Sequence, residues 1–224
     1  MSEAIWAALG ATSLEEVRRR TAVIDAIAEI TPIAVDGAER FAWNDGGGQS
    51  AVWYFTPDKQ ALLLTFDHES DLNLYAEEDY SVQEALYGGV PENLVALVRN
   101  RPENYESLNL VDAETGAAIH YAGGVFWFDG KGWRQAEGFL EHCRREGLDP
   151  LSESGFTYCA GPYLFGEEFT PEAIVEEPGR RRLVRRRRRR TGKGAGRHPG
   201  DLRAARLRLR SAHDLGSGVA PFGE

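Results

Sequence analysis

"RFAWNDGGGQSAVWYFTPDKQALLLTFDH" occupies residues 40–68 of a 224-residue chain. It contains three short runs rich in aromatic and aliphatic residues, 40–45, 51–58 and 61–68, separated by the turn-forming sequences DGGG and PDK. Runs of this length between glycine, proline and aspartate are typical of β-strands joined by tight turns. The sequence therefore predicts three consecutive antiparallel strands here.

Helical patterns flank these strands on both sides. Ser13 and Glu16 have the spacing of a capping box. The helix that they begin is expected to end near Pro32, because the residue before a proline avoids helical geometry. Since strands and helices do not alternate regularly, we expect an α+β fold with a mainly antiparallel sheet packed with a few helices. The other elements expected are helices over residues 81–89, 90–100, 136–147 and 170–177, strands over residues 107–112, 117–130 and 155–165, and a turn at residues 129–132. The side chains expected in the core include Leu62, Leu64, Phe126, Phe128, Phe139 and Leu140.

The charge of the chain changes sign near Gly179. Residues 1–178 hold 11 Lys and Arg against 32 Asp and Glu, a net of −21, and residues 179–224 hold 15 against 3, a net of +12, which together give −9. So sharp a change in composition is typical of a folded domain joined to a tail. We therefore expect an acidic α+β globular domain over residues 1–178, long enough to bury one core.

Residues 179–224 begin close to the arginine-rich sequence RRRLVRRRRRR and contain a single aromatic residue, Phe222. A segment with so few apolar side chains cannot form a packed core, so we expect a disordered basic tail. Such a tail can bind nucleic acid weakly and without sequence preference by neutralising phosphates. The same composition also arises when GC-rich DNA is read out of frame, and the sequence leaves both explanations of the tail open.

The sequence shows neither a targeting segment nor a membrane-spanning one. Its first residues lack a positively charged segment followed by an apolar one, and its longest apolar runs fall far short of the ~18 residues that span a bilayer. Two cysteines, Cys143 and Cys159, are too few for a disulfide framework. We therefore expect a cytoplasmic protein with no membrane association.

The densest group of charged residues follows the third predicted strand, in FDHESDLNLYAEEDY. Asp67, Glu69 and Asp71 match the first ligand positions of a calcium loop, but Leu72 stands where that loop requires glycine. A metal-dependent hydrolase would use the Asp67-His68-Glu69 segment differently, with carboxylates on a divalent ion and the imidazole as a base. Because no second half of such a site is recognisable, we expect no catalytic residue, bound metal or cofactor.

The remaining interpretation of this segment is an acidic, solvated surface that binds a partner. Tyr75 and Tyr80 flank its consecutive acidic residues, and aromatic side chains are enriched at protein interfaces. The residues expected to contribute to binding are Asp67, His68, Glu69, Asp71, Glu77, Glu78 and Asp79.

Three segments, LTFDHES, GVFWFDGKGW and PYLFGEEFTPEAIV, resemble small acidic cytosolic α+β proteins of GC-rich bacteria, including immunity proteins that neutralise toxins. The resemblance extends over residues 10–178 and assigns no functional residue. It implies a non-enzymatic binding protein, an inhibitor of a basic toxin or nuclease. The net charge of −21 also favours a basic protein partner, because electrostatic complementarity speeds association. An enzyme and a structural or regulatory domain remain the alternatives.

Overall fold

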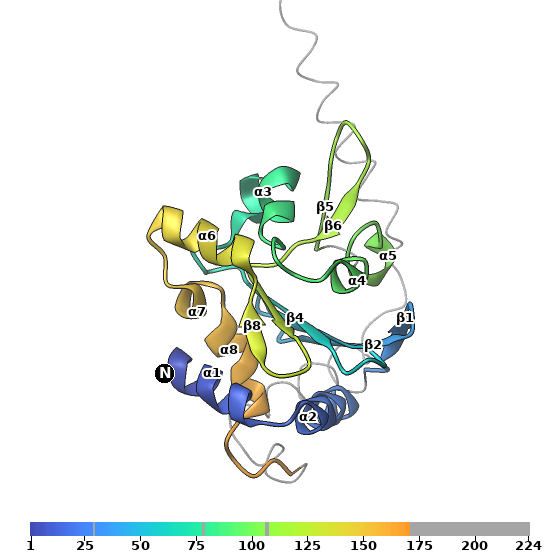
Figure 1. The fold of residues 1–224 in the computed structure, drawn as a ribbon, viewed down its shortest axis with the longest axis vertical. Coiled ribbons are helices and arrows are strands. Elements are labelled where there is room, and N and C mark those ends of the chain that lie inside the picture. Colours follow the sequence, from blue (N-terminus) through green and yellow to red (C-terminus); the bar gives the residue numbers. More distant parts are fainter. Residues whose placement is uncertain (29, 78, 106–107, 171–224) are drawn as a thin grey trace, which may run out of the picture. The chain divides into compact units, whose positions relative to one another are not determined.

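The computed structural model describes residues 1–170 except residues 29, 78, 106 and 107. These residues adopt an α+β fold in which helices pack on a mainly antiparallel sheet, as the sequence predicts (Figure 1). The predicted domain boundary at Gly179, the basic tail and the predicted helix over residues 170–177, apart from Thr170, lie outside the described residues. None of the helices described combines the length and the apolar character needed to cross a bilayer.

The main sheet has six antiparallel strands in the order β1-β2-β3-β4-β7-β8, and β5 and β6 form a separate two-stranded sheet. The three strands predicted from residues 40–68 are β2, β3 and β4, at the centre of the main sheet. The strands are β1 (Ile33–Val35), β2 (Ala38–Asn44), β3 (Gln49–Phe55), β4 (Ala61–Asp67), β5 (Asn109–Val111), β6 (Ala118–His120), β7 (Gly124–Phe128) and β8 (Trp133–Gln135).

The helices surround this sheet and begin and end at recognisable signals. The amide of Glu16 donates a hydrogen bond to Oγ of Ser13 at 3.2 Å, which is the predicted N-terminal cap of α2. Helix α6 ends at Gly147, whose φ of 73° a glycine adopts without strain. The helices are α1 (Ser2–Ala11), α2 (Leu14–Ile27), α3 (Tyr80–Ala85), α4 (Glu92–Val95), α5 (Pro102–Tyr105), α6 (Glu137–Glu146), α7 (Pro150–Glu153) and α8 (Phe156–Ala160), with 3₁₀ turns η1 (Leu74–Glu77) and η2 (Gly161–Tyr163).

One face of the main sheet packs against aromatic side chains of the N-terminal and C-terminal helices. Trp53 lies opposite Leu63, and Leu63 lies opposite Phe126, so these three side chains share this face. The ring of Phe126 is 5.0 Å from that of Phe156 in α8, and the ring of Trp53 is 5.2 Å from that of Tyr163 in η2. All five side chains are buried, so this layer is a continuous aromatic and aliphatic core.

The opposite face is covered by the segment that runs from α3 to β6 (Figure 1). Tyr54 and Leu62 are neighbours in register on this face, and Phe66 contacts the ring of Tyr121, just after β6, at 5.4 Å. Strands β3 and β4 are consequently buried at nearly every position instead of alternating between buried and exposed. A sheet covered on both faces has this pattern, which explains the continuous apolar run ALLL in β4.

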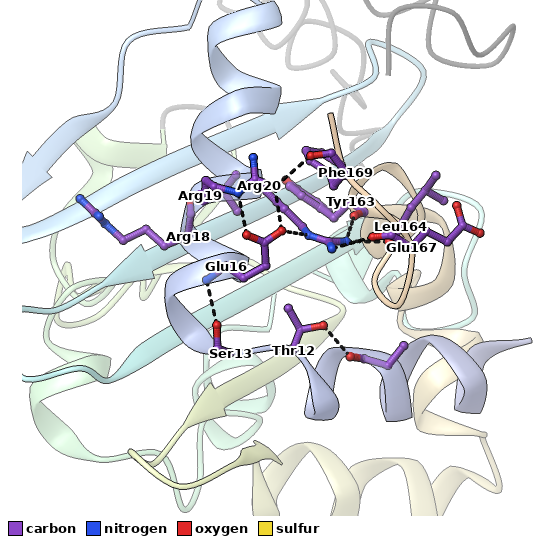
Figure 2. Close-up of polar contacts among 12 residues, drawn as sticks. Thr12, Ser13, Glu16, Arg18, Arg19, Arg20, Tyr163, Leu164, Glu167 and Phe169 are labelled. Atoms are coloured by element: carbon purple, nitrogen blue, oxygen red, sulfur yellow. Dashed lines mark hydrogen bonds and ion pairs between the residues drawn. The ribbon is translucent and has the colours of Figure 1, made fainter. Parts of the chain in front are cut away.

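A buried arginine holds the last described segment against α2 (Figure 2). Arg20 is 6% exposed, and its Nε donates to Glu16 Oε1 at 2.7 Å. The rest of its guanidinium donates to the carbonyl oxygens of Tyr163, Leu164 and Glu167 at 2.7 to 3.0 Å. A guanidinium with its fork of N–H donors can satisfy several carbonyl groups that a loop leaves unpaired. Arg20 therefore replaces the backbone partners that residues 163–167 would have in a helix or strand.

The sequence predictions for individual elements have mixed outcomes. The helix over residues 136–147, the strand over residues 107–112 and the turn at residues 129–132 are confirmed by α6, β5 and the β7–β8 hairpin. The single strand predicted over residues 117–130 is two strands, β6 and β7. The strand predicted over residues 155–165 is wrong, because α8 and η2 occupy it. The core is largely as predicted, since Leu62, Leu64, Phe126 and Phe139 are buried, whereas Phe128 and Leu140 are half-buried.

Candidate functional site

Three segments that are distant in sequence meet where β4 ends. The amide of His68 donates to the carbonyl of Gly48 at 3.1 Å, which joins the residues after β4 to the β2–β3 turn. On the other side, the hydroxyl of Ser70 donates to the carbonyl of Glu153 in α7. Residues 44–49, 66–75 and 149–159 together contain six Asp and Glu and no Lys or Arg. This end of the sheet therefore carries negative charge that no Lys or Arg of these three segments offsets.

The first of the predicted binding residues, Asp67, organises the site from within. It is 5% exposed, its Oδ2 accepts from Gln49 Nε2 at 3.1 Å, and its Oδ1 accepts from the amide of Glu69 at 3.1 Å. Its Cβ lies so close to Gly155 that a Cβ added there would be 2.5 Å away. Gly155 has a φ of 72°, so a glycine serves both the backbone conformation and the close approach. Asp67 fixes the turn after β4 and is not free to contact a partner.

The next predicted residues, His68, Glu69 and Asp71, are exposed on the turn that Asp67 holds. The side chains of His68 and Glu69 are 48% and 79% exposed, and Nε2 of His68 lies 3.8 Å from Oε1 of Glu69. Leu72, which occupies the glycine position of a calcium loop, is fully buried. The buried side chain of Leu72 directs this part of the turn toward the core. A calcium loop instead needs a glycine at this position, so that the backbone can bend sharply around the ion.

The last three predicted binding residues, 77–79, have different environments. Asp79 caps α3, because its Oδ1 accepts from the amides of Ser81 and Val82 at 2.9 and 3.2 Å. The hydroxyl of Ser81, which donates to Asp79 Oδ1 at 2.7 Å, and these two amides lower the pKa of Asp79, so its carboxylate stays ionised at neutral pH. Glu77 belongs to η1, and Glu78 lies outside the described residues. Asp79 is exposed but has a structural function that the sequence segment did not reveal.

Two carboxylates that sequence reasoning did not select join this surface. Glu153 is brought there by the contact of its carbonyl with Ser70, and Asp45 lies in the β2–β3 turn, where its Oδ1 accepts from the amides of Gly47 and Gln49 at 2.6 and 3.1 Å. The DGGG sequence marked that turn, but no sequence signal links it or α7 to the residues after β4. We call the surface formed by Asp45, Glu69, Asp71 and Glu153 the acidic end.

Basic side chains gather at the other end of the same strands. Lys59 lies in the β3–β4 turn, and Lys131 and Arg134 belong to the β7–β8 hairpin, in which Phe128 pairs with the first residue of β4. The ion pairs that arginines form with carboxylates in the described region involve other segments, such as Glu16, Glu39, Glu84, Glu92, Asp129 and Glu141. This other end also carries Asp58 and Asp129, so its charges are mixed, whereas the segments at the acidic end contain no Lys or Arg.

The cysteine beside the acidic end is no candidate nucleophile. Cys159 is fully buried, and burial raises the pKa of its thiol to about 12, so it is protonated and a poor nucleophile at neutral pH. Within residues 1–170, apart from the four positions not described, no group of three or more His, Cys, Asp and Glu side chains is arranged to hold a metal ion. What the acidic end offers is a group of carboxylates, of which Glu69 and Asp71 are exposed on the turn after β4 and Asp45 and Glu153 are half-buried.

Comparison with known proteins identifies no relative: the chain matches no protein-family model, no curated protein and no solved structure.

Proposed function

We propose that the domain is a binding protein that docks a basic protein on its acidic end, as an inhibitor or immunity protein of a basic toxin or nuclease would. The observation that carries the proposal is the meeting of three carboxylate-bearing segments without Lys or Arg at one end of the sheet. Like charges held close together raise the free energy of the isolated protein, and a cationic partner relieves that repulsion. A basic partner also gains association rate from the long-range attraction.

Aromatic side chains next to the acidic end support a protein rather than a small cation as the partner. Tyr158 in α8 is 64% exposed, although Cys159 beside it is fully buried and donates to the carbonyl of Phe66 at 3.4 Å. Tyr75 is 36% exposed, at the end of the segment that carries Glu69 and Asp71. Exposed tyrosines supply contact area at low entropic cost and are enriched at protein interfaces. Their place beside the carboxylates gives the surface both steering charge and contact area.

The proposal is tested by cross-linking in cells that express the full chain, followed by identification of the captured proteins. Three forms are compared: the unaltered protein, the triple variant Glu69→Gln, Asp71→Asn, Glu153→Gln, and a matched control. The control, Asp58→Asn, Glu114→Gln, Glu168→Gln, removes the same charge from exposed positions elsewhere. We expect a basic protein to be captured by the unaltered and control forms and lost from the triple variant. Capture that is equal for all three forms, or of proteins without net positive charge, would refute the proposal.

A further inference from the structure

A cavity lies on the sheet face that α5 and β6 cover, and it reaches the β2–β3 turn, since Asn44 and Ser50 line it. Its volume is about 480 Å³, which is within the range of about 300–1,000 Å³ typical of small-molecule sites. Its floor is formed by alternate residues of β2 and β3, and its walls by residues of α5 and β6 and by Leu108. The residues that form it include Arg40, Ser50, Val52, Asn104, Leu108 and His120, together with one carboxylate, that of the exposed Glu103. One side of the cavity is thus apolar and the other carries hydrogen-bond donors.

Arg40 differs from the other arginines of the domain. Eight of the nine arginines in the described residues lie within 4 Å of a carboxylate oxygen, in pairs such as Arg18–Glu39 and Arg134–Asp129. Arg40 forms no such pair with any described residue, and its Nε is buried without a hydrogen-bond acceptor. A buried guanidinium N–H without an acceptor costs free energy, and an anionic ligand would recover it.

The strand register fixes what surrounds this guanidinium. Arg40 in β2 lies directly opposite Tyr54 in β3, and Val52 and Ser50 follow on the same face. Tyr54 is fully buried, and its hydroxyl meets no partner in hydrogen-bonding geometry among the described atoms. Burial raises the pKa of Tyr54, and the nearby Arg40 partly opposes this rise through its charge and as a hydrogen-bond donor, although the two groups are not well aligned. The buried Nε of Arg40 and the hydroxyl of Tyr54 therefore lie near each other, and of these two residues Arg40 lines the cavity.

On the opposite wall of the cavity, His120 carries no charge that would neutralise or repel the guanidinium of Arg40. His120 is 2% exposed, and burial together with the charge of Arg40 lowers its pKa to about 3, so its imidazole is neutral at neutral pH. Its backbone is fixed, because its amide donates to the carbonyl of Val98 at 3.1 Å and its carbonyl accepts from the hydroxyl of Tyr87 at 2.7 Å. The wall is rigid and uncharged at this point.

Another cavity, which Arg18 and Lys59 help to line, is a weaker candidate for an anion. Its volume is about 710 Å³, and its guanidinium, that of Arg18, donates from Nε to Glu39 at 2.5 Å. Glu15 adds a second carboxylate to its wall, whereas the cavity beside Arg40 has one, that of Glu103. The ammonium of Lys59, which also lines the larger of these two cavities, is exposed to solvent and has no buried N–H to satisfy. A guanidinium that already has a carboxylate partner gains little from a second anion, so the arrangement around Arg40 is the more favourable one.

We propose that the cavity between β2, β3 and β6 binds a small organic carboxylate, with its carboxylate on the guanidinium of Arg40 and its apolar part against Val52 and Leu108. The planar fork of arginine matches a carboxylate with two parallel hydrogen bonds. Ser50 and Asn104, which also form the cavity, add donors at the same rim. The site uses none of the four carboxylates of the acidic end, so the binding of a small carboxylate is tested independently of the proposed protein partner.

The test uses the full chain, labelled with ¹⁵N, and hexanoate as the probe, with uncharged hexanamide as its matched control. Hexanoate is expected to shift the Nε–Hε signal of Arg40 and the amide signals of Val52 and Asn104 in a saturable way. Hexanamide and the Arg40→Gln variant are each expected to show binding weaker by at least about tenfold, because a charge-assisted pair is lost. The variant Arg134→Gln, which removes the same charge from an exposed position on β8, is expected to bind as the unaltered protein does.

Arg40→Lys keeps the charge but not the fork, and it serves if Arg40→Gln fails to fold. It is expected to bind hexanoate several-fold more weakly than the unaltered protein while still preferring it to hexanamide. Equal binding of hexanoate and hexanamide would overturn the proposal. Shifts centred on Lys59 or Arg134 instead of Arg40, or unchanged affinity in a folded Arg40→Gln protein, would overturn it as well.

Discussion

Replacing Asp25 by asparagine should stabilise the domain above neutral pH and leave it nearly unchanged in acid. Asp25 lies in α2, is 1% exposed, and accepts one hydrogen bond at Oδ2 from the amide of Ala42 in β2 at 3.3 Å. Burial raises the pKa of its carboxyl from 3.8 to about 7, against the opposing effects of that hydrogen bond and of Arg40. An asparagine side chain has the same shape and keeps an oxygen for the Ala42 amide.

The magnitude follows from the difference between the two pKa values of Asp25. In the unfolded chain the carboxyl loses its proton near pH 3.8, whereas in the folded protein it keeps the proton until about pH 7. The folded state therefore binds more protons between these values, and the contribution of Asp25 to stability falls as the pH rises through them. About three pH units at 1.36 kcal/mol per unit give a loss of at most about 4 kcal/mol, complete above pH 7.

His120 contributes in the opposite direction over nearly the same pH range. Its folded-state pKa of about 3 is below the ordinary value of 6.5, so its contribution to stability is present above pH 6.5 and is lost as the pH falls. The two buried groups therefore largely offset each other in the unaltered protein, whose stability should vary little between pH 4 and 7 on their account. The difference between the variant and the unaltered protein isolates Asp25.

Urea unfolding of both proteins at intervals from pH 4 to 8, followed by far-ultraviolet circular dichroism, measures this difference. The free energy of unfolding of Asp25→Asn should exceed that of the unaltered protein by an amount that grows from near zero at pH 4 to about 2–4 kcal/mol at pH 8. A difference that is independent of pH, or that grows toward acid, would refute the reasoning. Asp36→Asn, at an exposed aspartate, controls for the loss of a surface carboxylate.

The other predictions concern the contacts that hold the fold. Arg20→Ala should lower the free energy of unfolding, measured in urea, by about 3–5 kcal/mol, because a buried network of charge-assisted hydrogen bonds is removed. A loss below about 1 kcal/mol would contradict a stabilising role for the Arg20 contacts drawn in Figure 2. Gly138→Ala should lower the free energy of unfolding by about 1–3 kcal/mol, since the added Cβ would lie 1.8 Å from the carbonyl oxygen of Ala85. An unchanged thermal or urea transition would show that this contact relaxes without cost. Cys159 and Cys143, with pKa values raised to about 12 and 11, should react with a thiol reagent at pH 7 far more slowly in the folded than in the urea-unfolded protein, and equal rates would contradict their burial.

The pattern of apolar residues was sufficient to predict the centre of the sheet. Residues 40–68 contain short aromatic runs between turn sequences. Such runs indicate strands from local sequence alone, without knowledge of the tertiary fold. The same reasoning failed at residues 155–165, where apolar residues are nearly continuous and period alone cannot separate a strand from a short buried helix. There the structure is determined by tertiary contacts, such as the one between Cys159 and the carbonyl of Phe66.

The candidate site was predictable only as a concentration of charge. Glu69 and Asp71 were found from sequence because they are adjacent to a predicted strand, but Asp67, selected with them, is buried and holds the turn. Glu153 could not be found, because a contact across more than eighty residues brings it to the same surface. Burial of a carboxylate depends on what packs around it, and neither Asp67 nor Asp25 carries a local sign of it.

The association rate of the basic partner identified by cross-linking tests the central claim most directly. Measured at low salt by stopped-flow fluorescence, the rate constant for the triple variant of Glu69, Asp71 and Glu153 should be lower than that of the unaltered protein by about tenfold, and the two should converge at about 0.5 M salt, where exposed charges are screened. The charge-matched control at Asp58 and Glu114, together with Glu168, should associate nearly as fast as the unaltered protein. Equal rates for the triple variant and the unaltered protein at low salt would contradict the account.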